Sequence, residues 1–231
     1  MSGETLRVGG CDASVQEAVQ WVRGYFDAEA NRAAAAVAKG RPYAFPAYDR
    51  METGSGPDEL NDGDLLASVL LSVTPRLHAF LNLQAVRSDL EAVLAAIPPR
   101  LTLRDAVASG RHAEPLRRLG DLLDHPALLR GVGGTTLMKI MHRKRPLFLP
   151  LYDSRVYACY CGPGIPYPIQ HSSRRTWAQF FPLLGEAMAR DLDEQPDTWK
   201  VLKECVPDDV SVLRVLDVVA WSLGRGDAPV R

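Results

Sequence analysis

The sequence feature that most constrains this chain is the glycine-rich segment Leu129-Arg130-Gly131-Val132-Gly133-Gly134-Thr135-Thr136. Gly131 and Gly133 permit a backbone turn that a Cβ would obstruct, so the segment predicts a tight hairpin between two helices. The first N–H groups of the second helix lack intrahelical partners and can donate to a phosphate oxygen, helped by the helix dipole. The segment therefore predicts an anion-binding turn in a helical protein.

The charge around this hairpin differs from that of the rest of the chain. Between His125 and Gly185 stand eight basic residues and one acidic residue, Asp153, which gives the segment a net charge of +7. The whole chain carries −1, so all other residues sum to −8. A local positive field of this kind is typical of proteins that bind a polyanion such as DNA. The basic residues are Arg130, Lys139, Arg143, Lys144, Arg145, Arg155, Arg174 and Arg175.

The composition is that of a globular protein, with 231 residues, 46% hydrophobic and 24% charged. No apolar run approaches the roughly 18 residues that span a bilayer, and the first residues lack the apolar core of a signal peptide. We therefore expect a cytoplasmic protein without membrane association. The four cysteines include no Cys-x-x-Cys pair and no His-Glu-x-x-His pattern occurs, so we expect reduced thiols and no metal site.

Helical patterns cover nearly the whole chain, and strand-type alternation is weak. Ser14-Val15-Gln16-Glu17 is a capping box that opens a helix to about Lys39, and a mobile loop is expected over 41–60. An apolar helix over 65–73 is expected to be central. Further helices are predicted at about 85–96, from Thr102, and at about 114–123, 125–130, 134–144, from Asp153, from Ser172 or Ser173 to 190, and 209–223.

Residues 128–156 resemble the helix-hairpin-helix DNA glycosylase superfamily of the endonuclease III and alkyladenine type. The family pattern is Leu-Pro-Gly-Val/Ile-Gly, an apolar and basic helix, and then a Val-Asp-Thr-His-Val-like segment. Here it appears as Leu129-Arg130-Gly131-Val132-Gly133 and Tyr152-Asp153-Ser154-Arg155-Val156. Asp153 lies 22 residues after Gly131, the offset found in the family. The resemblance covers about 30 residues of the chain.

This resemblance implies an all-α, two-lobed fold with duplex DNA as partner. Residues 1–60 would pack with the C-terminal helical lobe of 151–231, and 61–150 would form the other lobe, ending in the hairpin. Asp153 would be catalytic, and the hairpin carbonyls could hold a monovalent cation, with no other cofactor. The DNA-backbone contacts would come from Gly131, Val132, Gly133, Gly134, Thr135, Thr136, Lys139, Arg143, Lys144 and Arg145.

Departures from the family pattern narrow the expected chemistry. Bifunctional members place a Schiff-base lysine 18 residues before the aspartate, where this chain has Thr135. A hydroxyl cannot form that imine, so any activity should be base excision without strand cleavage. The cysteine-rich iron–sulfur loop of some members is absent, Ser154-Arg155 replaces Thr-His, and Arg130 replaces the proline.

The whole chain also resembles an uncharacterised bacterial domain family, and this resemblance supports the fold more than a function. This likeness rests on Asp64-Leu65-Leu66-Ala67, on Lys144-Arg145-Pro146 with Pro150-Leu151-Tyr152-Asp153, and on Leu213-Arg214-Val215-Leu216-Asp217-Val218-Val219-Ala220-Trp221.

Each candidate residue also has a structural interpretation. Asp153 is a good helix N-cap, and His142-Arg143-Lys144-Arg145 could be a solvated helix end. Tyr152, Tyr157 and Tyr160 could line a base pocket or simply pack in the core, as could Tyr167. Arg214 and Asp217 are spaced for an intrahelical pair beside a packed Trp221, and Asp62 and Asp64 are expected to be cap residues.

Three functions remain open at this stage. The leading hypothesis is a DNA-binding protein that removes a damaged or modified base with Asp153. The second hypothesis is a non-catalytic accessory module that has the same fold and also binds DNA. The third is an all-α protein-interaction domain whose hairpin only packs helices, which the overall charge of −1 favours mildly.

Overall fold

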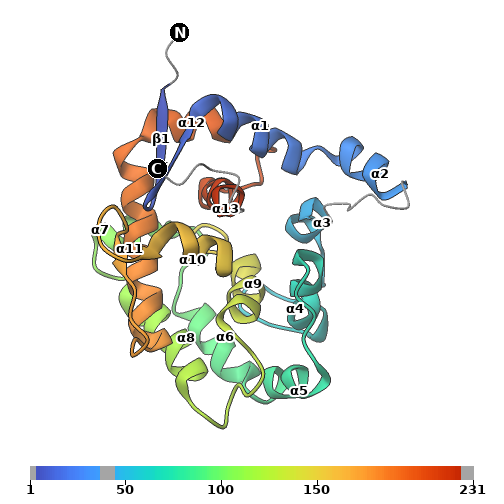
Figure 1. Ribbon diagram of the computed structural model, residues 1–231. Helices are drawn as coiled ribbons and strands as arrows, with labels where there is room; N and C mark the ends of the chain where they lie inside the picture. Colours follow the sequence, from blue (N-terminus) through green and yellow to red (C-terminus); the bar gives the residue numbers. More distant parts are fainter. Residues whose placement is uncertain (1–3, 37–44, 225–231) are drawn as a thin grey trace.

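The computed structural model describes residues 4–36 and 45–224, which fold into a mainly helical structure (Figure 1). Strand β1 (Thr5–Val8) pairs antiparallel with β2 (Cys11–Ser14), and the two-residue strands β3 (Cys161–Gly162) and β4 (Ile169–Gln170) pair in parallel. The helices are α1 (Val15–Phe26), α2 (Ala28–Ala36), α3 (Phe45–Arg50), α4 (Asp62–Leu66), the 3-10 helix η1 (Ala67–Leu71), α5 (Leu77–Ala85), α6 (Arg87–Ala95), α7 (Leu103–Ala108), α8 (Ala113–Asp124), α9 (Gly134–Lys144), α10 (Ser154–Tyr160), α11 (Trp177–Glu194), α12 (Pro196–Lys203) and α13 (Val212–Leu223).

The first helix begins as predicted but is shorter. The Ser14 hydroxyl accepts from the Glu17 N–H, and the Glu17 carboxylate accepts from the Ser14 N–H, so the capping box is present. The prediction of one helix to Lys39 is wrong, because the chain leaves the helix at Asp27. The Asp27 carboxylate accepts from the N–H groups of Glu29 and Ala30, both at 2.9 Å, and so starts α2. Residues 37–44 lie outside the described part.

The predicted mobile loop contains ordered structure where it is described. Residues 45–50 form α3, and the chain from Met51 to Leu60 packs against the end of α9. The predicted central helix over 65–73 is instead the short α4 followed by η1. Leu66 and Val69 are 42% and 43% exposed, so this segment lies at the surface rather than at the centre.

Helix starts follow local capping chemistry. Thr102 caps α7 and Ser211 caps α13, each by accepting an N–H three residues later. The helix expected from Ser172 or Ser173 starts at Trp177 instead. Thr176 accepts from the Gln179 N–H, and the Gln179 side chain accepts from the Thr176 N–H, which completes a capping box there.

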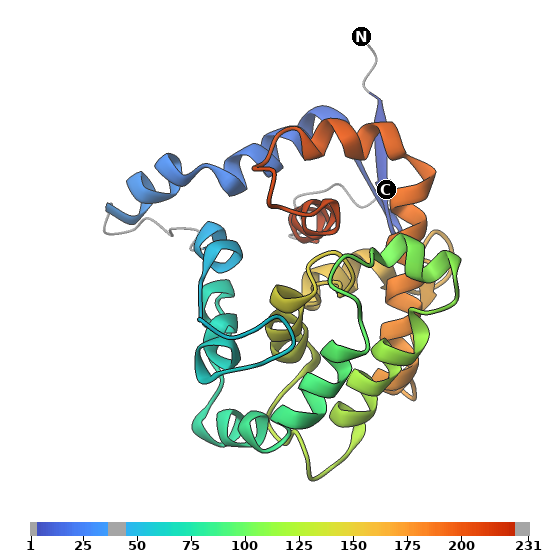
Figure 2. The same ribbon diagram turned by 180° about the vertical axis from the view of Figure 1, so that it is seen from behind.

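One continuous cluster of buried apolar side chains extends from Leu6 to Leu223. Helix α11 lies along α8 and α7 and reaches the first strand pair, while α1, β1 and β2 lie against α13 (Figure 2). The Gly9 N–H donates to the Asp191 carboxylate at 2.7 Å, which joins the first strand pair to α11. In the described ranges, no helix combines the length and apolar character needed to cross a membrane.

The α8–α11 contact requires a glycine. A Cβ at Gly120 would lie 2.2 Å from the backbone nitrogen of Ala178, so the two helices touch through backbone atoms. Gly24 in α1 is different, because nothing lies within 4 Å of a Cβ placed there.

We therefore expect Gly120→Ala to lower the free energy of unfolding by about 3 kcal/mol, since backbone atoms cannot rearrange around the added methyl group. Gly24→Ala is the matched control and should raise it by about 0.5–1 kcal/mol, through helix propensity alone. Urea unfolding followed by circular dichroism measures both. Equal effects of the two substitutions would contradict the close packing.

Candidate functional site

The glycine-rich segment forms a tight turn that leads directly into α9. Leu129 and Val132 anchor it in the core, 3% and 8% exposed, and the Val132 N–H donates to the Leu129 carbonyl at 2.9 Å. Gly131 has φ of +83°, a left-handed conformation that favours glycine. The Asn82 side chain of α5 donates to the Arg130 carbonyl at 2.8 Å. The turn is thus held on the core side while its tip faces solvent.

The start of α9 carries no side-chain cap. Gly133 occupies the N-cap position with extended backbone and has no side-chain oxygen to accept an N–H. Thr135 is half-buried and Thr136 is 8% exposed, and neither caps the helix. By contrast, Asp153 caps α10 with its carboxylate. The N–H groups at the start of α9 therefore have no side-chain cap, and a phosphate oxygen could accept from them instead.

The helix predicted at 125–130 is absent. Helix α8 ends at Asp124, and His125 is extended, with φ −75° and ψ 118°, because the following Pro126 disfavours helical backbone before it. The Asp124 carboxylate accepts from the N–H groups of Trp177 and Ala178, both at 2.9 Å. Turns over 125–133 therefore connect α8 to α9, so α8 is the helix that precedes the glycine-rich turn.

The basic end of α9 is buried rather than solvated. Arg143 and Lys144 both pair with Asp64, at 3.3 and 3.2 Å, and each of the two side chains is only 10% exposed. Asp64 is 2% exposed and also closes the capping box of Asn61 at the start of α4. Although burial raises the pKa of Asp64, hydrogen bonds, first that of Ser55, lower it below its ordinary value. Asp64 is thus an ion-pair acceptor as well as the expected cap residue.

Arg145 is even more enclosed, at 1% exposed. Its guanidinium donates to the carbonyls of Leu94 at 2.7 Å, Ile97 at 2.6 Å and Pro57 at 2.8 Å, and it pairs with Asp58. The guanidinium of Arg145 is therefore occupied by partners within the protein. The predicted role of the basic cluster as an exposed DNA-backbone surface does not agree with this burial, because Arg143, Lys144 and Arg145 hold neighbouring segments together.

Asp153 is the N-cap of α10, as the sequence predicted. Its Oδ1 accepts from the N–H groups of Arg155 at 2.9 Å and Val156 at 3.0 Å. Its Oδ2 lies 3.9 Å from Nζ of Lys139, which also donates to the Leu71 carbonyl at 3.1 Å. The Asp153 side chain is 17% exposed and the Lys139 side chain 8%. One carboxylate oxygen therefore holds the helix start, while the other faces a cation.

A second charged group lies beside this pair. Arg214 of α13 donates to Asp49 at 2.9 Å and to the Tyr25 hydroxyl at 2.6 Å, and it pairs with Asp217 one turn away. Burial raises the pKa of Asp217 to about 6, an effect that Arg214 opposes and the nearby charge of Asp153 adds to. The predicted intrahelical pair is confirmed, and it extends to two further elements.

Lys139 interacts electrostatically with both acids. Burial lowers its pKa, while the negative charges of Asp153 and Asp217 raise it and the charge of Arg214 lowers it. The charges of Asp153, Arg214 and Asp217 thus all act on Lys139, and we call these four residues the polar cluster. It joins the middle of α9, the start of α10 and α13. Lys139 belongs to this cluster rather than to a solvated basic surface.

His142 borders the polar cluster one turn beyond Lys139. Its Nδ1 donates to the Leu149 carbonyl at 2.5 Å, and its ring stacks on Tyr48 with centroids 6.4 Å apart. The Tyr48 hydroxyl in turn donates to the Lys139 carbonyl at 2.5 Å. Burial lowers the pKa of His142 to about 4, so the ring is neutral near pH 7.

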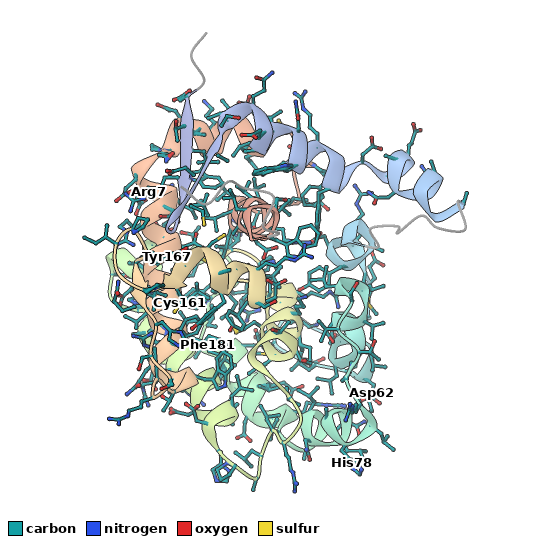
Figure 3. All side chains as sticks on the ribbon, in the orientation of Figure 1. Arg7, Asp62, His78, Cys161, Tyr167 and Phe181 are labelled. Atoms are coloured by element: carbon teal, nitrogen blue, oxygen red, sulfur yellow. The ribbon has the colours of Figure 1, made fainter. Side chains whose placement is uncertain are left out.

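The three tyrosines predicted for the base pocket differ in burial and in their partners. Tyr160 is fully buried and donates to Asp191 at 2.7 Å, so it is a core residue. Tyr152 is 9% exposed and packs edge-to-face on Trp177, Phe180 and Phe181 (Phe181 is labelled in Figure 3). Tyr157 is half-buried, and its hydroxyl lies 2.8 Å from Nδ1 of His171. Only Tyr157 retains exposure near Asp153, one turn along α10.

Sequence reasoning missed Tyr25, Tyr48 and Asp49 as partners of this site. The only hint of them in the sequence is in α13, where Arg214 and Asp217 form a charge pair within an otherwise almost wholly apolar helix. A pair in that setting indicates burial and hence further polar partners. Trp221 of the same helix lies under the guanidinium of Arg155, 4.4 Å from the ring centroid.

Two negative findings apply to the described residues. A cavity of about 470 Å³ opens between α7, the end of α11 and the start of α13, and none of the predicted site residues lines it. In 4–36 and 45–224, no three histidine, cysteine or acidic side chains come together as metal ligands.

The sequence matches the Family of unknown function (DUF6308) over residues 18–224. The chain belongs to this family. The matched range includes the hairpin, α9, Asp153 and α13, so the polar cluster lies wholly within the family's domain. No curated protein and no solved structure matches the chain.

The buried His142 predicts a pH-dependent stability. Its folded pKa of about 4 lies below the ordinary 6.5, so the unfolded chain takes up a proton first as pH falls. The contribution of His142 to stability is therefore complete above pH 6.5 and is lost as pH falls to 4, by about 3 kcal/mol. We expect the stability difference between the wild type and His142→Phe to shift by that amount against the wild type.

Urea unfolding of both proteins at pH 7, 5.5 and 4 measures this shift. Asp217 titrates in the opposite direction, because its raised pKa makes the folded state bind protons first, but it is present in both proteins and cancels. A difference that stays constant with pH would show that His142 is not buried in neutral form.

Proposed function

We propose that this protein binds duplex DNA through the hairpin and the start of α9, and that Asp153 promotes hydrolysis of the N-glycosidic bond of a damaged or modified base. In this proposal the helices form a two-lobed, helix-hairpin-helix glycosylase-like fold that acts on DNA in the cytoplasm. One observation carries it. Helix α9 has the uncapped turn at its start and, five residues on, Lys139 beside Asp153. That separation is about 8 Å along the helix axis.

The two carboxylate oxygens of Asp153 can serve different purposes, one as the helix cap and the other toward a substrate. Oδ1 is fixed by two backbone N–H groups, so the carboxylate has a defined orientation. Oδ2 makes only the longer 3.9 Å approach to Lys139 and is the oxygen that can face a substrate. A carboxylate placed there would stabilise the oxocarbenium-like sugar as the base departs, or take a proton from the attacking water. The base itself would first leave the stack.

The proposed reaction ends at base release. Thr135 occupies the position of the imine-forming lysine of bifunctional helix-hairpin-helix glycosylases, and its hydroxyl cannot form that bond. The Lys139 amine is 8% exposed and already donates to the Leu71 carbonyl. We therefore propose a monofunctional activity without strand cleavage.

A second candidate is a non-catalytic DNA-binding module of the same fold. It is favoured by the full engagement of Asp153 as a helix cap and ion-pair partner, which gives the residue a sufficient structural role. The burial of Arg143, Lys144 and Arg145 also leaves less positive charge on the surface than the sequence implied.

The test is base release from duplex DNA that carries alkylated, deaminated or oxidised bases, with freed bases detected by mass spectrometry. Asp153→Asn should abolish release, at least 100-fold, because the charge is lost. The substitution should retain the α10 cap, since asparagine caps as well as aspartate. Thr102→Ala is the matched control, because it removes the α7 cap at a cost of about 1 kcal/mol without touching Asp153.

Three outcomes separate the candidates. Release that disappears in Asp153→Asn and persists in Thr102→Ala supports the glycosylase. DNA binding without release from any of these substrates favours the accessory module. Affinity for DNA that is absent, or does not fall with salt, favours a protein-interaction domain.

A further inference from the structure

The turn before α9 and the loop before α11 carry three arginines at or near the surface. Lys139, Arg143, Lys144 and Arg145 have internal partners, as described above. Arg130 and Arg174 are exposed, and Arg175 is half-buried. Across the described residues, none of these three forms a salt bridge with an acidic side chain. Their charge is therefore available to a ligand.

The loop that carries Arg174 and Arg175 sits directly against the start of α9. It leads into α11, whose first residue, Trp177, packs on Gly134: a Cβ at Gly134 would lie 2.6 Å from the Trp177 ring. Asp124, at the end of α8, accepts from the backbone N–H of Trp177 at 2.9 Å. Figure 1 shows the α8–α9 connection and the start of α11 at the same end of the molecule. The hairpin and this loop thus form one surface.

The Asp124 carboxylate, at the end of α8, is occupied by the start of α11. Both carboxylate oxygens of Asp124 accept backbone N–H groups, from Trp177 and Ala178, so they are directed into the start of α11. Between Asp124 and Trp177 the chain has no acid other than Asp153. The segments that form this surface, within residues 125–176, therefore carry a net positive charge.

Two contacts hold residues 171–176, which we call the arginine loop. The Arg175 guanidinium donates to the Gln170 carbonyl at 2.6 Å, which closes the loop on itself just after β4. The Tyr157 hydroxyl and His171 Nδ1 lie 2.8 Å apart and tie its beginning to α10. Figure 3 labels Cys161 and Tyr167, which mark the chain leading into it. Arg174 is left as the exposed cation at the tip.

We infer that residues 171–176 are a second DNA-backbone contact, in which Arg174 and Arg175 bind phosphates on one side of the α9 start while Arg130 binds on the other. This inference rests on the proposed function. Guanidinium groups suit the task because they bind phosphate oxygens in a bidentate fashion. The hairpin N–H groups and the arginines then hold neighbouring phosphates of one duplex, without reading its sequence.

The experiment compares two double variants that lose the same charge. Arg174→Gln with Arg175→Gln alters the loop, whereas Arg23→Gln with Arg32→Gln alters two exposed arginines of α1 and α2, at the other end of the molecule (Figure 1). The affinity of the full chain for a 20-base-pair duplex is measured between 50 and 200 mM salt. The loop variant should bind about tenfold more weakly, and its log–log salt slope should shrink by about 2. The control should match the wild type.

The outcomes distinguish this inference from the proposed function. If the wild type binds and both double variants behave alike, the loop is not a contact and the inference fails while DNA binding stands. If the wild type does not bind duplex DNA at any salt concentration, the proposed function fails and this inference with it. Arg174→Gln alone keeps the Arg175–Gln170 hydrogen bond, so the loop should retain its structure. This single variant should show about half of the slope change, which separates loss of charge from loss of loop structure.

Discussion

The buried carboxylate of Asp64 is the interaction on which the placement of α9 depends. It accepts from Thr53 at 2.8 Å and pairs with Arg143 and Lys144, so it fastens the irregular chain before α4 to the C-terminal half of α9. Removal of one partner of such a buried pair leaves an uncompensated charge, which costs several kcal/mol. Because α9 also carries the hairpin at one end and Lys139 in its middle, its position sets the geometry of the whole candidate site.

Parts of this arrangement followed from the sequence because they depend on local chemistry. The capping box at Ser14, the cap at Asp153, the turn at Gly131 and the Arg214–Asp217 pair involve residues within a few positions of one another. The polar cluster could not be predicted in the same way. Its members come from helices far apart in sequence, and periodicity does not show that Lys139 faces Asp153.

Errors in the sequence-based reasoning share one physical cause. Runs of charge indicate how many cations a segment has but not where their side chains go. Arg145 appeared to belong to a solvated helix end, yet it reaches backbone carbonyls of Leu94 and Ile97 in the core. The sequence predicts Arg174 in the first turn of a helix that begins at Ser172 or Ser173, but Arg174 lies in the loop before α11, where its side chain is exposed. Surface charge therefore has to be counted after internal pairing.

The packing of the first strand pair and α1 has a consequence for how the chain acquires its structure. Tyr25 meets Arg214, Gly9 meets Asp191 and the Arg7 N–H meets Gln195, so these partners are synthesised 182–189 residues after the first strand pair and α1. On a ribosome, the strand pair and α1 must wait exposed until α11 to α13 have emerged. These contacts can therefore form only after the whole intervening segment has been synthesised, and until then the amphipathic α1 lacks the partners that cover it.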